Sequence, residues 1–389
     1  MDLQSNIKEY LNSIDNDFDL PYLESYFQIF NELLVIYELN PEINDELNES
    51  QECLKYYIRM TLQKELTLLY TYNDRINKVN SLKELKLPDQ RTPEWYEMRK
   101  NKLTASSFAD ALGKGHFKSR DESILDKIIE TPFVENPITQ WGVKYEEIAT
   151  RFYEYLTKAK IYEFGLIPHP EFPAFGASPD GICDTDSPPQ YIGRMLEIKC
   201  PPKRKFTKSV PPHYWMQMQG QLEVCDLEEC DFLQVKLEEY NNLDEYLQDV
   251  NEKVGFTKDD LPKGYTITYT EQNSIKSQYL YCPLFSSNEF IDEWRKEKLQ
   301  YLEDNNLIFK EEKYWKITRY ECTLVTRDKG WWNSVVKDIY QFYEDLLFYK
   351  KDNNVEILKK KILEKKSKNP VFHVEEKFDD FCLISDEEN

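Results

Sequence analysis

The feature that most constrains this chain is a pair of short segments, Ala177-Ser-Pro-Asp-Gly181 and Arg194-Met-Leu-Glu-Ile-Lys199. Side chains that alternate along a strand leave the same face, so we expect Glu197 and Lys199 to point the same way. Asp180 lies between a proline and a glycine, as in a turn. If the two segments pair as a hairpin, the carboxylates of Asp180 and Glu197 come together.

Two neighbouring carboxylates predict a divalent cation. Their charges repel each other and raise a pKa unless a cation offsets the repulsion. Oxygen ligands suit Mg²⁺ or Mn²⁺, so the expected ligands are Asp180, Glu197 and the carbonyl of Ile198. Lys199 would then lie beside the metal and orient or help to deprotonate an attacking water. The alternative is that this Glu-x-Lys triplet marks a solvated strand face, where such triplets are common.

Two helical segments carry further polar groups. Trp141–Ala149 opens a predicted helix before the strands, and its Glu146 or Glu147 could supply a third carboxylate. Tyr214–Gln221 contains three glutamines, whose amides both donate and accept hydrogen bonds and so suit a water or a phosphate oxygen. Both segments therefore add groups that fit a metal-dependent reaction at phosphate.

Cationic and hydroxyl side chains predict where a phosphate would bind. Arg99 can bind phosphate bidentately, and the Ser/Thr cluster in residues 104–107 could hold an anion at a helix start. The run Lys203, Arg204 and Lys205 directly follows the Glu-x-Lys strand. It is either a solvated loop or a loop that tracks phosphates.

These motifs occur in a fixed order along the chain: Trp95-x-x-x-Arg99 with Thr104-Ala-Ser106, Trp141-Gly142-x-x-x-Glu146, Ser178-Pro-Asp180-Gly, Leu196-Glu197-Ile-Lys199-Cys-Pro201, and Gln217-x-Gln219. The order resembles the lambda-exonuclease-like, YqaJ-type viral recombinase branch of the PD-(D/E)xK nucleases, over residues 91–348. The resemblance implies an α/β fold with a restriction-endonuclease-like core, in which a mixed sheet is flanked by helices.

The resemblance also implies roles for single residues. Asp180 and Glu197 would be the main metal ligands and Lys199 the water-orienting base, with Glu146 at a second Mg²⁺ or Mn²⁺ ion. Further site residues would be the glutamine pair Gln217 and Gln219, and Arg99, Ser106 and Ser178, which would grip the 5′-phosphate of a DNA end.

The activity that the resemblance implies is Mg²⁺-dependent 5′→3′ digestion of duplex DNA ends in viral or phage-type recombination, repair or replication. A single-strand annealing protein and further copies of the chain are the expected partners besides DNA. Two alternatives stay open, namely a structure- or site-specific endonuclease of the same fold and a catalytically silent DNA-binding scaffold.

The domain organisation follows from changes in pattern along the chain. Apolar residues spaced by three and four predict an acidic helical extension over residues 1–90. The nuclease domain is expected at 91–348, with a polar, acidic insertion at about 241–275. Residues 349–389 are expected to form a basic helix end and an acidic, disordered tail.

Secondary structure within the nuclease domain follows from periodicity and breaker residues. The predicted helices cover residues 138–156, 214–225 and 329–363. The predicted strands cover residues 172–183, 194–200, 231–238, 277–285 and 314–326.

Composition narrows the classes of function further. The eight cysteines form no CxxC pair and the four histidines no HExxH motif, which argues against a zinc enzyme. Most of the net charge of −21 lies near the two ends of the chain, so the middle is nearly neutral and can still bind DNA. With no long apolar run and no secretory signal, we expect a soluble, intracellular protein with no membrane partner. The Lys-, Asn-, Ile- and Tyr-rich composition is typical of an A/T-rich genome, such as that of a large DNA virus, and so of a viral protein in its host cell.

Overall fold

The computed structural model describes residues 7, 10–11, 28–33, 35, 51–100, 102–116, 118–129, 137–203, 206, 209–274, 276–351 and 354–368. The chain divides into two compact units, residues 1–78 and 79–389. Among the described residues, no helix combines the length and the apolar character needed to cross a membrane. The predicted acidic tail lies outside the described residues.

The first unit is helical where it is described. Its longest element is α4 (Gln51–Lys83), which continues into the second unit. Apolar side chains on one stripe of α4, including Ile58, Leu62 and Leu66, are fully buried in a small cluster with Leu33. This is the spacing of three and four that predicts a helix, and it confirms the predicted helix over this part of the chain.

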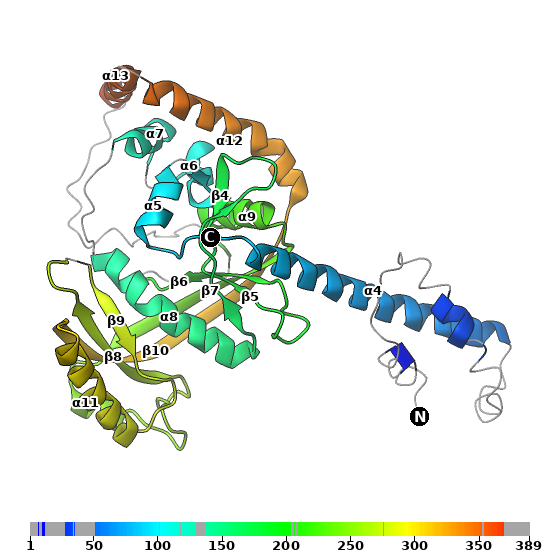
Figure 1. The fold of residues 1–389 in the computed structure, drawn as a ribbon, viewed down its shortest axis with the longest axis horizontal. Helices are drawn as coiled ribbons and strands as arrows, with labels where there is room; N and C mark the ends of the chain where they lie inside the picture. Colours follow the sequence, from blue (N-terminus) through cyan, green and yellow to red (C-terminus); the bar gives the residue numbers. More distant parts are fainter. Residues whose placement is uncertain are drawn as a thin grey trace, which may run out of the picture. The chain divides into compact units, whose positions relative to one another are not determined.

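The second unit is built around a mixed sheet of seven strands among the described residues, in the order β2-β5-β6-β7-β10-β8-β9 (Figure 1). Strand β6 pairs in parallel with β7, and the other neighbours are antiparallel. The strands are β2 (Ile161–Tyr162), β5 (Gly181–Cys183), β6 (Met195–Lys199), β7 (Glu229–Glu239), β8 (Lys263–Thr270), β9 (Gln278–Tyr281) and β10 (Ile308–Thr326).

A smaller sheet has the order β1-β4-β3, with β1 (Leu103–Thr104), β4 (Phe175–Ala177) and β3 (Ile167–Pro168). The helices of this unit are α5 (Pro93–Lys100), the 3₁₀ turn η1 (Ala105–Ser107), α6 (Phe108–Ala111), α7 (Arg120–Ile128), α8 (Pro137–Thr157), α9 (Pro212–Cys225), α10 (Leu243–Gln248), α11 (Asn288–Asp304), α12 (Lys329–Lys350) and α13 (Asn354–Lys368).

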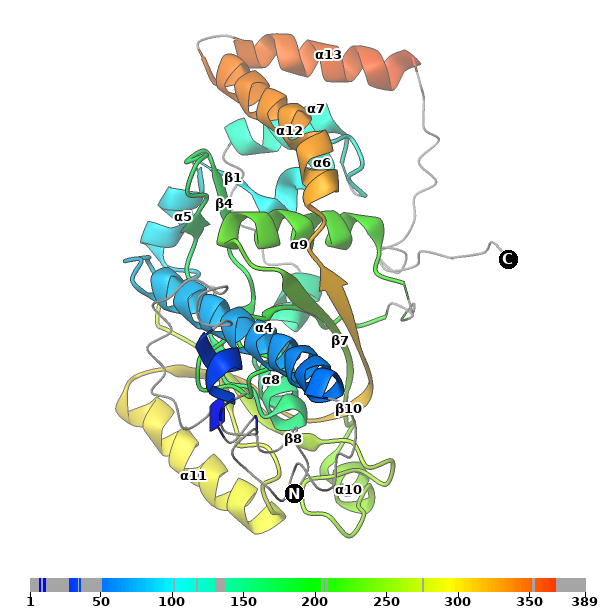
Figure 2. The same ribbon diagram turned by 90° about the vertical axis from the view of Figure 1, so that its right-hand side faces the viewer.

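Two helices cover opposite faces of the large sheet. Helix α8 packs its buried face, including Tyr145 and Phe152, against Leu196 and Ile198 of β6. Helix α9 packs Met218 and Leu222 against the other face, where α6, α7 and α12 add a further layer (Figures 1 and 2). The predicted α/β core, a mixed sheet flanked by helices, is confirmed.

Three predicted elements need correction. The predicted strand 172–183 is two strands in different sheets, because Ser178-Pro-Asp180 breaks it between β4 and β5. The predicted last helix ends at Lys350, since Lys351 is extended with φ −84° and ψ 132°, and α13 follows separately.

The expected polar insertion at 241–275 contains a strand of the main sheet, which the sequence analysis missed. Strand β8 pairs with β10 and β9, and its side chains Tyr265 and Ile267 are fully buried. Its composition, Gly-Tyr-Thr-Ile-Thr-Tyr-Thr, suits a strand packed on both faces, although the acidic residues before it dominate the segment.

Candidate active site

The two segments that open the sequence analysis do form a hairpin-like pair. Strands β5 and β6 are antiparallel, with Gly181 opposite Leu196. The Asp180 carboxylate accepts a hydrogen bond from the backbone N–H of Ile198 at 2.6 Å. Gly181 permits the neighbouring strand β2 to come close, since a Cβ atom there would lie 2.3 Å from Cγ2 of Ile161. Asp180 is therefore held at the edge of β6 by backbone geometry.

Glu197 and Lys199 share one face of β6, as their alternation predicts. The Glu197 side chain is 1% exposed and points toward α9. Its Oε1 accepts from Gln217 Nε2 at 2.7 Å and from Lys199 Nζ, and its Oε2 accepts from Gln221 Nε2 at 2.8 Å. A buried carboxylate needs such donors, because desolvation disfavours an uncompensated charge.

Lys199 is surrounded by acidic groups. Burial lowers its pKa, but the charges of Glu197 and Asp180 outweigh burial and raise the pKa above its ordinary value. The ammonium also donates to the Ile198 carbonyl at 3.1 Å. In this arrangement Lys199 is protonated at neutral pH, so it can donate a hydrogen bond to a water or a phosphate oxygen and cannot accept a proton.

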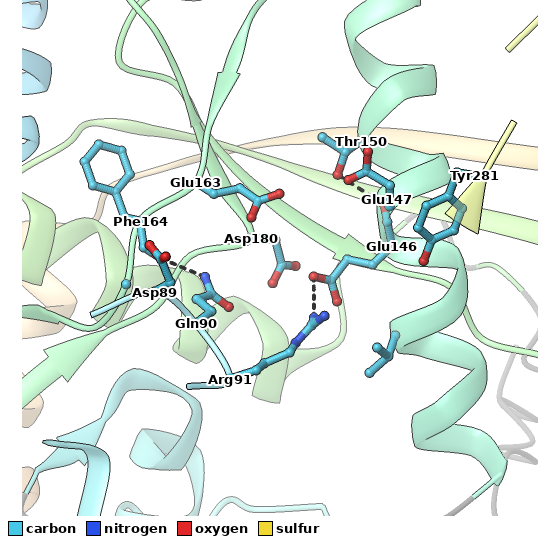
Figure 3. Close-up of a pocket in the computed structure, with 12 residues that line it drawn as sticks. Asp89, Gln90, Arg91, Glu146, Glu147, Thr150, Glu163, Phe164, Asp180 and Tyr281 are labelled. Carbon is cyan, nitrogen blue, oxygen red and sulfur yellow. Dashed lines mark hydrogen bonds and ion pairs between the residues drawn. The ribbon is translucent and has the colours of Figure 1, made fainter. Parts of the chain in front are cut away.

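Acidic side chains gather in a cavity of about 410 Å³ beside this hairpin, shown in Figure 3. Glu146 of α8 and Asp180 point toward each other across it (Figure 3). Burial raises the pKa of both carboxyls, and the neighbouring Glu197 raises them further. The residues lining this acidic cavity are Asp89, Gln90, Arg91, Val143, Glu146, Glu147, Thr150, Glu163, Phe164, Gly165, Asp180 and Tyr281.

The chemistry of this donor set fits a hard divalent cation. Glu146 and Asp180 offer carboxylate oxygens from two elements, and their mutual repulsion would be relieved by a positive ion. Among the described residues, no three acidic, histidine or cysteine side chains form a ready-made metal site. The two oxygens of the Glu197 carboxylate accept hydrogen bonds from Lys199, Gln217 and Gln221.

A second cavity, of about 220 Å³, collects the residues predicted to bind phosphate. It is lined by Gln90, Arg91, Trp95, Arg99, Thr104, Ala105, Ser106, Ser178, Gln217 and Gln221. Arg99, Ser106, Ser178 and Gln217 come from four separate elements or loops, so the fold brings together residues up to 118 positions apart in number. We call this the phosphate cavity.

Arg99 is held by aromatic and hydroxyl neighbours within the phosphate cavity. Its guanidinium lies 4.7 Å from the centre of the Trp95 ring, and Nη2 donates to Ser106 Oγ at 3.4 Å. Burial lowers the pKa of Arg99. Burial and the charge of Arg99 also lower the pKa of Lys127 on α7, to about 8. Arg99 and Lys127 are neighbouring cations whose burial disfavours their charge, so an anionic ligand beside them would be stabilised.

Some predicted residues do not join these cavities. Gln219 points away from Glu197, because it lies two residues from Gln217 on a helix; it donates to the Thr326 carbonyl at 2.9 Å and accepts from the Asp328 N–H at 2.6 Å. Lys203 is exposed in the loop after β6, and Arg204 and Lys205 lie outside the described residues.

Two residues of the site were not singled out from the sequence: Gln221, which was noted only as one of three glutamines, and Arg91. Gln221 bonds Glu197 alongside Gln217, and a spacing of four on a helix could have indicated it, since such residues share a face. Arg91 forms an ion pair with Glu146, Nη2 to Oε1 at 2.7 Å, across 55 positions of sequence. No local pattern marks Arg91.

The fold and the hairpin define a class. A mixed sheet with helices on both faces carries Asp180 at one strand and Glu197 and Lys199 on the next, which is the arrangement that the resemblance to the PD-(D/E)xK nucleases implies. Residues 94–228 match the model of the YqaJ-like viral recombinase domain. This part of the chain is therefore similar to the YqaJ-like viral recombinase domain, and the resemblance stated from its motifs is confirmed over these residues.

Sequence relatives of the chain come from viruses. The chain is 31% identical over 320 residues to an uncharacterized protein, R354, of Acanthamoeba polyphaga mimivirus, which covers 75% of this chain and 58% of that protein. It is 23% identical over 158 residues to protein D345L of African swine fever virus, covering 35% of this chain and 46% of that protein. The chain thus spans less than two thirds of these relatives.

Solved structures with some similarity are exonucleases. An alkaline exonuclease from Laribacter hongkongensis, LHK-Exo, aligns with a TM-score of 0.39 and 21% identity, covering 70% of this chain and 100% of that chain. A phage-related exonuclease from Haemophilus somnus aligns with a TM-score of 0.32 and 13% identity, covering 64% of this chain and 93% of that chain.

Proposed function

We propose that this chain is a Mg²⁺-dependent deoxyribonuclease that digests duplex DNA from its ends in the 5′→3′ direction, in viral recombination, repair or replication. One observation carries the proposal. Gln217 and Gln221 bond the Glu197 carboxylate and also line the phosphate cavity with Arg99, Ser106 and Ser178. The candidate hydrolytic group and the candidate phosphate pocket are thus joined by two side chains of α9.

Glu146, Asp180 and the Ile198 carbonyl are the groups that would hold the cation, with Glu197 beside them. A bound divalent ion lowers the pKa of water and offsets charge at the reacting phosphate. The chain keeps Glu146 and Asp180 on separate elements, so both remain oriented into the acidic cavity (Figure 3). We expect a second ion, as the family resemblance implies, to involve Glu146.

Lys199 supports the reaction by donating hydrogen bonds. Its raised pKa keeps the ammonium charged, so it orients a water and stabilises developing negative charge. Gln217 and Gln221 fix Glu197, which in turn holds Lys199.

The phosphate cavity supports the proposed polarity. A terminal 5′-phosphate carries more charge and more free acceptor oxygens than an internal diester, so a pocket with Arg99, Ser106 and Ser178 favours it. A strand end anchored there would present a nearby internal phosphodiester to the acidic cavity. On this proposal, nucleotides would be released from the 5′ end.

The proposal is tested by digestion of end-labelled linear duplex DNA and covalently closed circles with and without Mg²⁺. We expect 5′→3′ loss of label from linear DNA only, and only with the metal. Asp180→Asn should abolish the activity. Asp184→Asn is the matched control, because Asp184 lies at the other end of β5 and pairs with Lys83 away from both cavities. Nicking of closed circles would favour the endonuclease alternative, and DNA binding without cleavage would favour the silent scaffold.

Arg99 supplies a second test, of polarity. Loss of a hydrogen bond to a charged group costs about 1.5–3 kcal/mol, so Arg99→Ala should reduce the preference for 5′-phosphorylated over 5′-hydroxyl ends by about tenfold to a hundredfold. Arg99→Lys should recover only part of it, since an ammonium lacks the planar fork. Equal rates on both kinds of end in the unaltered protein would contradict a 5′-phosphate pocket.

A further inference from the structure

Arg91 lies where the acidic cavity and the phosphate cavity meet, because it lines both. The loop that carries it is fixed by its neighbour: Gln90 Nε2 donates to the carbonyls of Phe164 at 2.9 Å and of Pro179 at 3.0 Å. Pro179 directly precedes Asp180. The backbone of Arg91 is therefore tied to the loop that carries the Asp180 carboxylate.

The backbone of Arg91 has a left-handed conformation, with φ of +67°. Residues other than glycine rarely adopt this conformation, because their Cβ atom comes close to the backbone. Such conformations persist where the surrounding structure fixes them, and they cluster at ligand-binding sites. Here the two Gln90 hydrogen bonds fix the loop, and the result is that a guanidinium enters the acidic cavity (Figure 3).

The contact that Arg91 makes is one that a bound cation would disturb. Among the residues that the structure describes, its guanidinium is hydrogen-bonded only to Glu146, through Nη2. Both side chains remain about one third exposed, at 36% and 32%. A divalent ion on Glu146 would compete with the guanidinium for the same oxygens and repel it. Released from Glu146, Arg91 could reach an anion in the adjoining phosphate cavity.

The neighbouring pair on the same helix is different. Glu147 pairs with Arg151 at 2.6 Å, one turn along α8, with nearly the same exposure of 33% and 34%. That pair needs no distant segment and no unusual backbone conformation. A carboxylate on α8 can thus be neutralised by a cation of the same helix. Glu146 is instead paired with Arg91, which belongs to a distant loop.

We propose that Arg91 is a phosphate-binding residue of the nuclease site, which neutralises Glu146 while no divalent cation is bound and turns to a phosphate of the DNA strand when the cation takes Glu146. This inference rests on the proposed function. It predicts opposite effects of one substitution on two ligands, because Arg91 competes with the metal and attracts the DNA.

The test uses the full chain and the variants Arg91→Ala, Arg91→Lys and Arg91→Gly, with Arg151→Ala as matched control. Calorimetric titration with Mn²⁺ alone should show tighter binding in Arg91→Ala than in the unaltered chain. Binding of a short 5′-phosphorylated duplex in Ca²⁺ should be about tenfold weaker, as expected for a lost charge-assisted contact. Arg91→Lys should bind DNA with intermediate affinity.

Arg91→Gly separates charge from backbone strain. It should lose DNA affinity as Arg91→Ala does while raising the thermal midpoint, since glycine adopts positive φ without cost. Arg151→Ala should change neither affinity. If Mn²⁺ and DNA both bind more weakly to Arg91→Ala, or if its DNA affinity is unchanged, Arg91 only stabilises the fold and the inference is wrong. If the unaltered chain neither binds Mn²⁺ nor cleaves DNA, the proposed function itself fails and the inference fails with it.

Discussion

At the scale of single residues, the glutamines of α9 differ in role according to their position along the helix. Gln217 and Gln221 both donate to Glu197, whereas Gln219 lies on another face of the helix and joins the Thr326 carbonyl to the Asp328 N–H. Asp328 caps α12, where its side chain accepts from the Trp331 N–H. Gln219 therefore supports the fold and Gln221 supports the site.

This contrast gives a prediction. Gln221→Ala should lower the single-turnover cleavage rate by about tenfold to a hundredfold, because a carboxylate loses one hydrogen bond worth about 1.5–3 kcal/mol. Gln219→Ala should leave the rate within a few-fold and lower the thermal midpoint instead. Both are measured by rapid-quench digestion and thermal denaturation of the same preparations. The opposite pattern, with Gln219 controlling the rate, would restore the glutamine pair expected from sequence.

At the scale of elements, glycine sets how closely α9 approaches the turn that carries Ser106. A Cβ atom at Gly220 would lie 2.3 Å from Cδ2 of Phe108 and 3.2 Å from the Cβ of Ala105. No such contact exists at Gly142 of α8, where nothing lies within 4 Å. Close packing thus requires a glycine at position 220, whereas position 142 has room for a larger side chain.

Substituting each glycine should have opposite effects on stability. Gly220→Ala should destabilise the protein by about 1–3 kcal/mol, the cost of overpacking a core, and should weaken the preference for 5′-phosphorylated ends because α9 and η1 separate. Gly142→Ala should stabilise the protein by about 0.5–1 kcal/mol, since alanine favours a helix. Urea denaturation measures both. Equal stability of the two variants would contradict the close packing at Gly220.

Ion pairs join α13 to α7, where Leu358 and Ile362 of α13 are also buried. Lys361 and Lys365 bond Asp121 at 2.8 and 2.6 Å, and Lys366 bonds Glu122 at 2.7 Å. Hydrogen bonds from Lys366 and Ser119 lower the pKa of Glu122 from its ordinary value of 4.5 to about 2. Since the pKa is depressed in the folded state, this stabilisation is present above pH 4.5 and is lost as the pH falls through about 2.

We therefore expect Glu122→Gln to flatten the acid side of the stability curve within that window. The change in free energy of unfolding should not exceed about 1 kcal/mol, because solvent screens a partly exposed pair. Thermal midpoints measured across the window test this. Glu356→Gln is the control, since Glu356 pairs with Lys359 within α13. An unchanged pH profile in Glu122→Gln would show that this pair contributes nothing to docking.

At the scale of the whole molecule, all residues that line the two cavities belong to the second unit, residues 79–389. The core of that unit also includes Val79 and Leu82 from the end of α4. The boundary that matters for folding thus lies inside a helix. The predicted domain limits at 90 and 348 stay predictions.

Truncation tests this organisation. A chain that begins at residue 79 should unfold cooperatively and show the proposed nuclease activity. A chain that begins at residue 91 should be less stable by about 2–5 kcal/mol, because it loses two core side chains, and should also lose the Gln90 hydrogen bonds. Circular dichroism and DNA digestion distinguish the two. Loss of activity in the longer of these chains, the one beginning at residue 79, would mean that the first unit is needed for function.

Local sequence was sufficient for much of the core. Alternation along β6 predicted that Glu197 and Lys199 share a face, and the hairpin considered for the two motif segments is present as the antiparallel pair of β5 and β6. Helices α8 and α9 correspond to the helices predicted over residues 138–156 and 214–225. These features depend on neighbouring residues, so local patterns were enough to predict them.

Other features depend on contacts between distant segments, so they are seen only in the folded chain. The burial of β8 requires its pairing with β10, and the entry of Arg91 into the acidic cavity requires the Gln90 bonds to Phe164 and Pro179. The choice of Gln221 over Gln219 was available from helical spacing, but only once Glu197 was known to face α9. In each case a strand, a charged side chain or an amide is stabilised by a partner from a distant part of the chain. Folding brings that partner into contact, and the local sequence does not predict which residue it is.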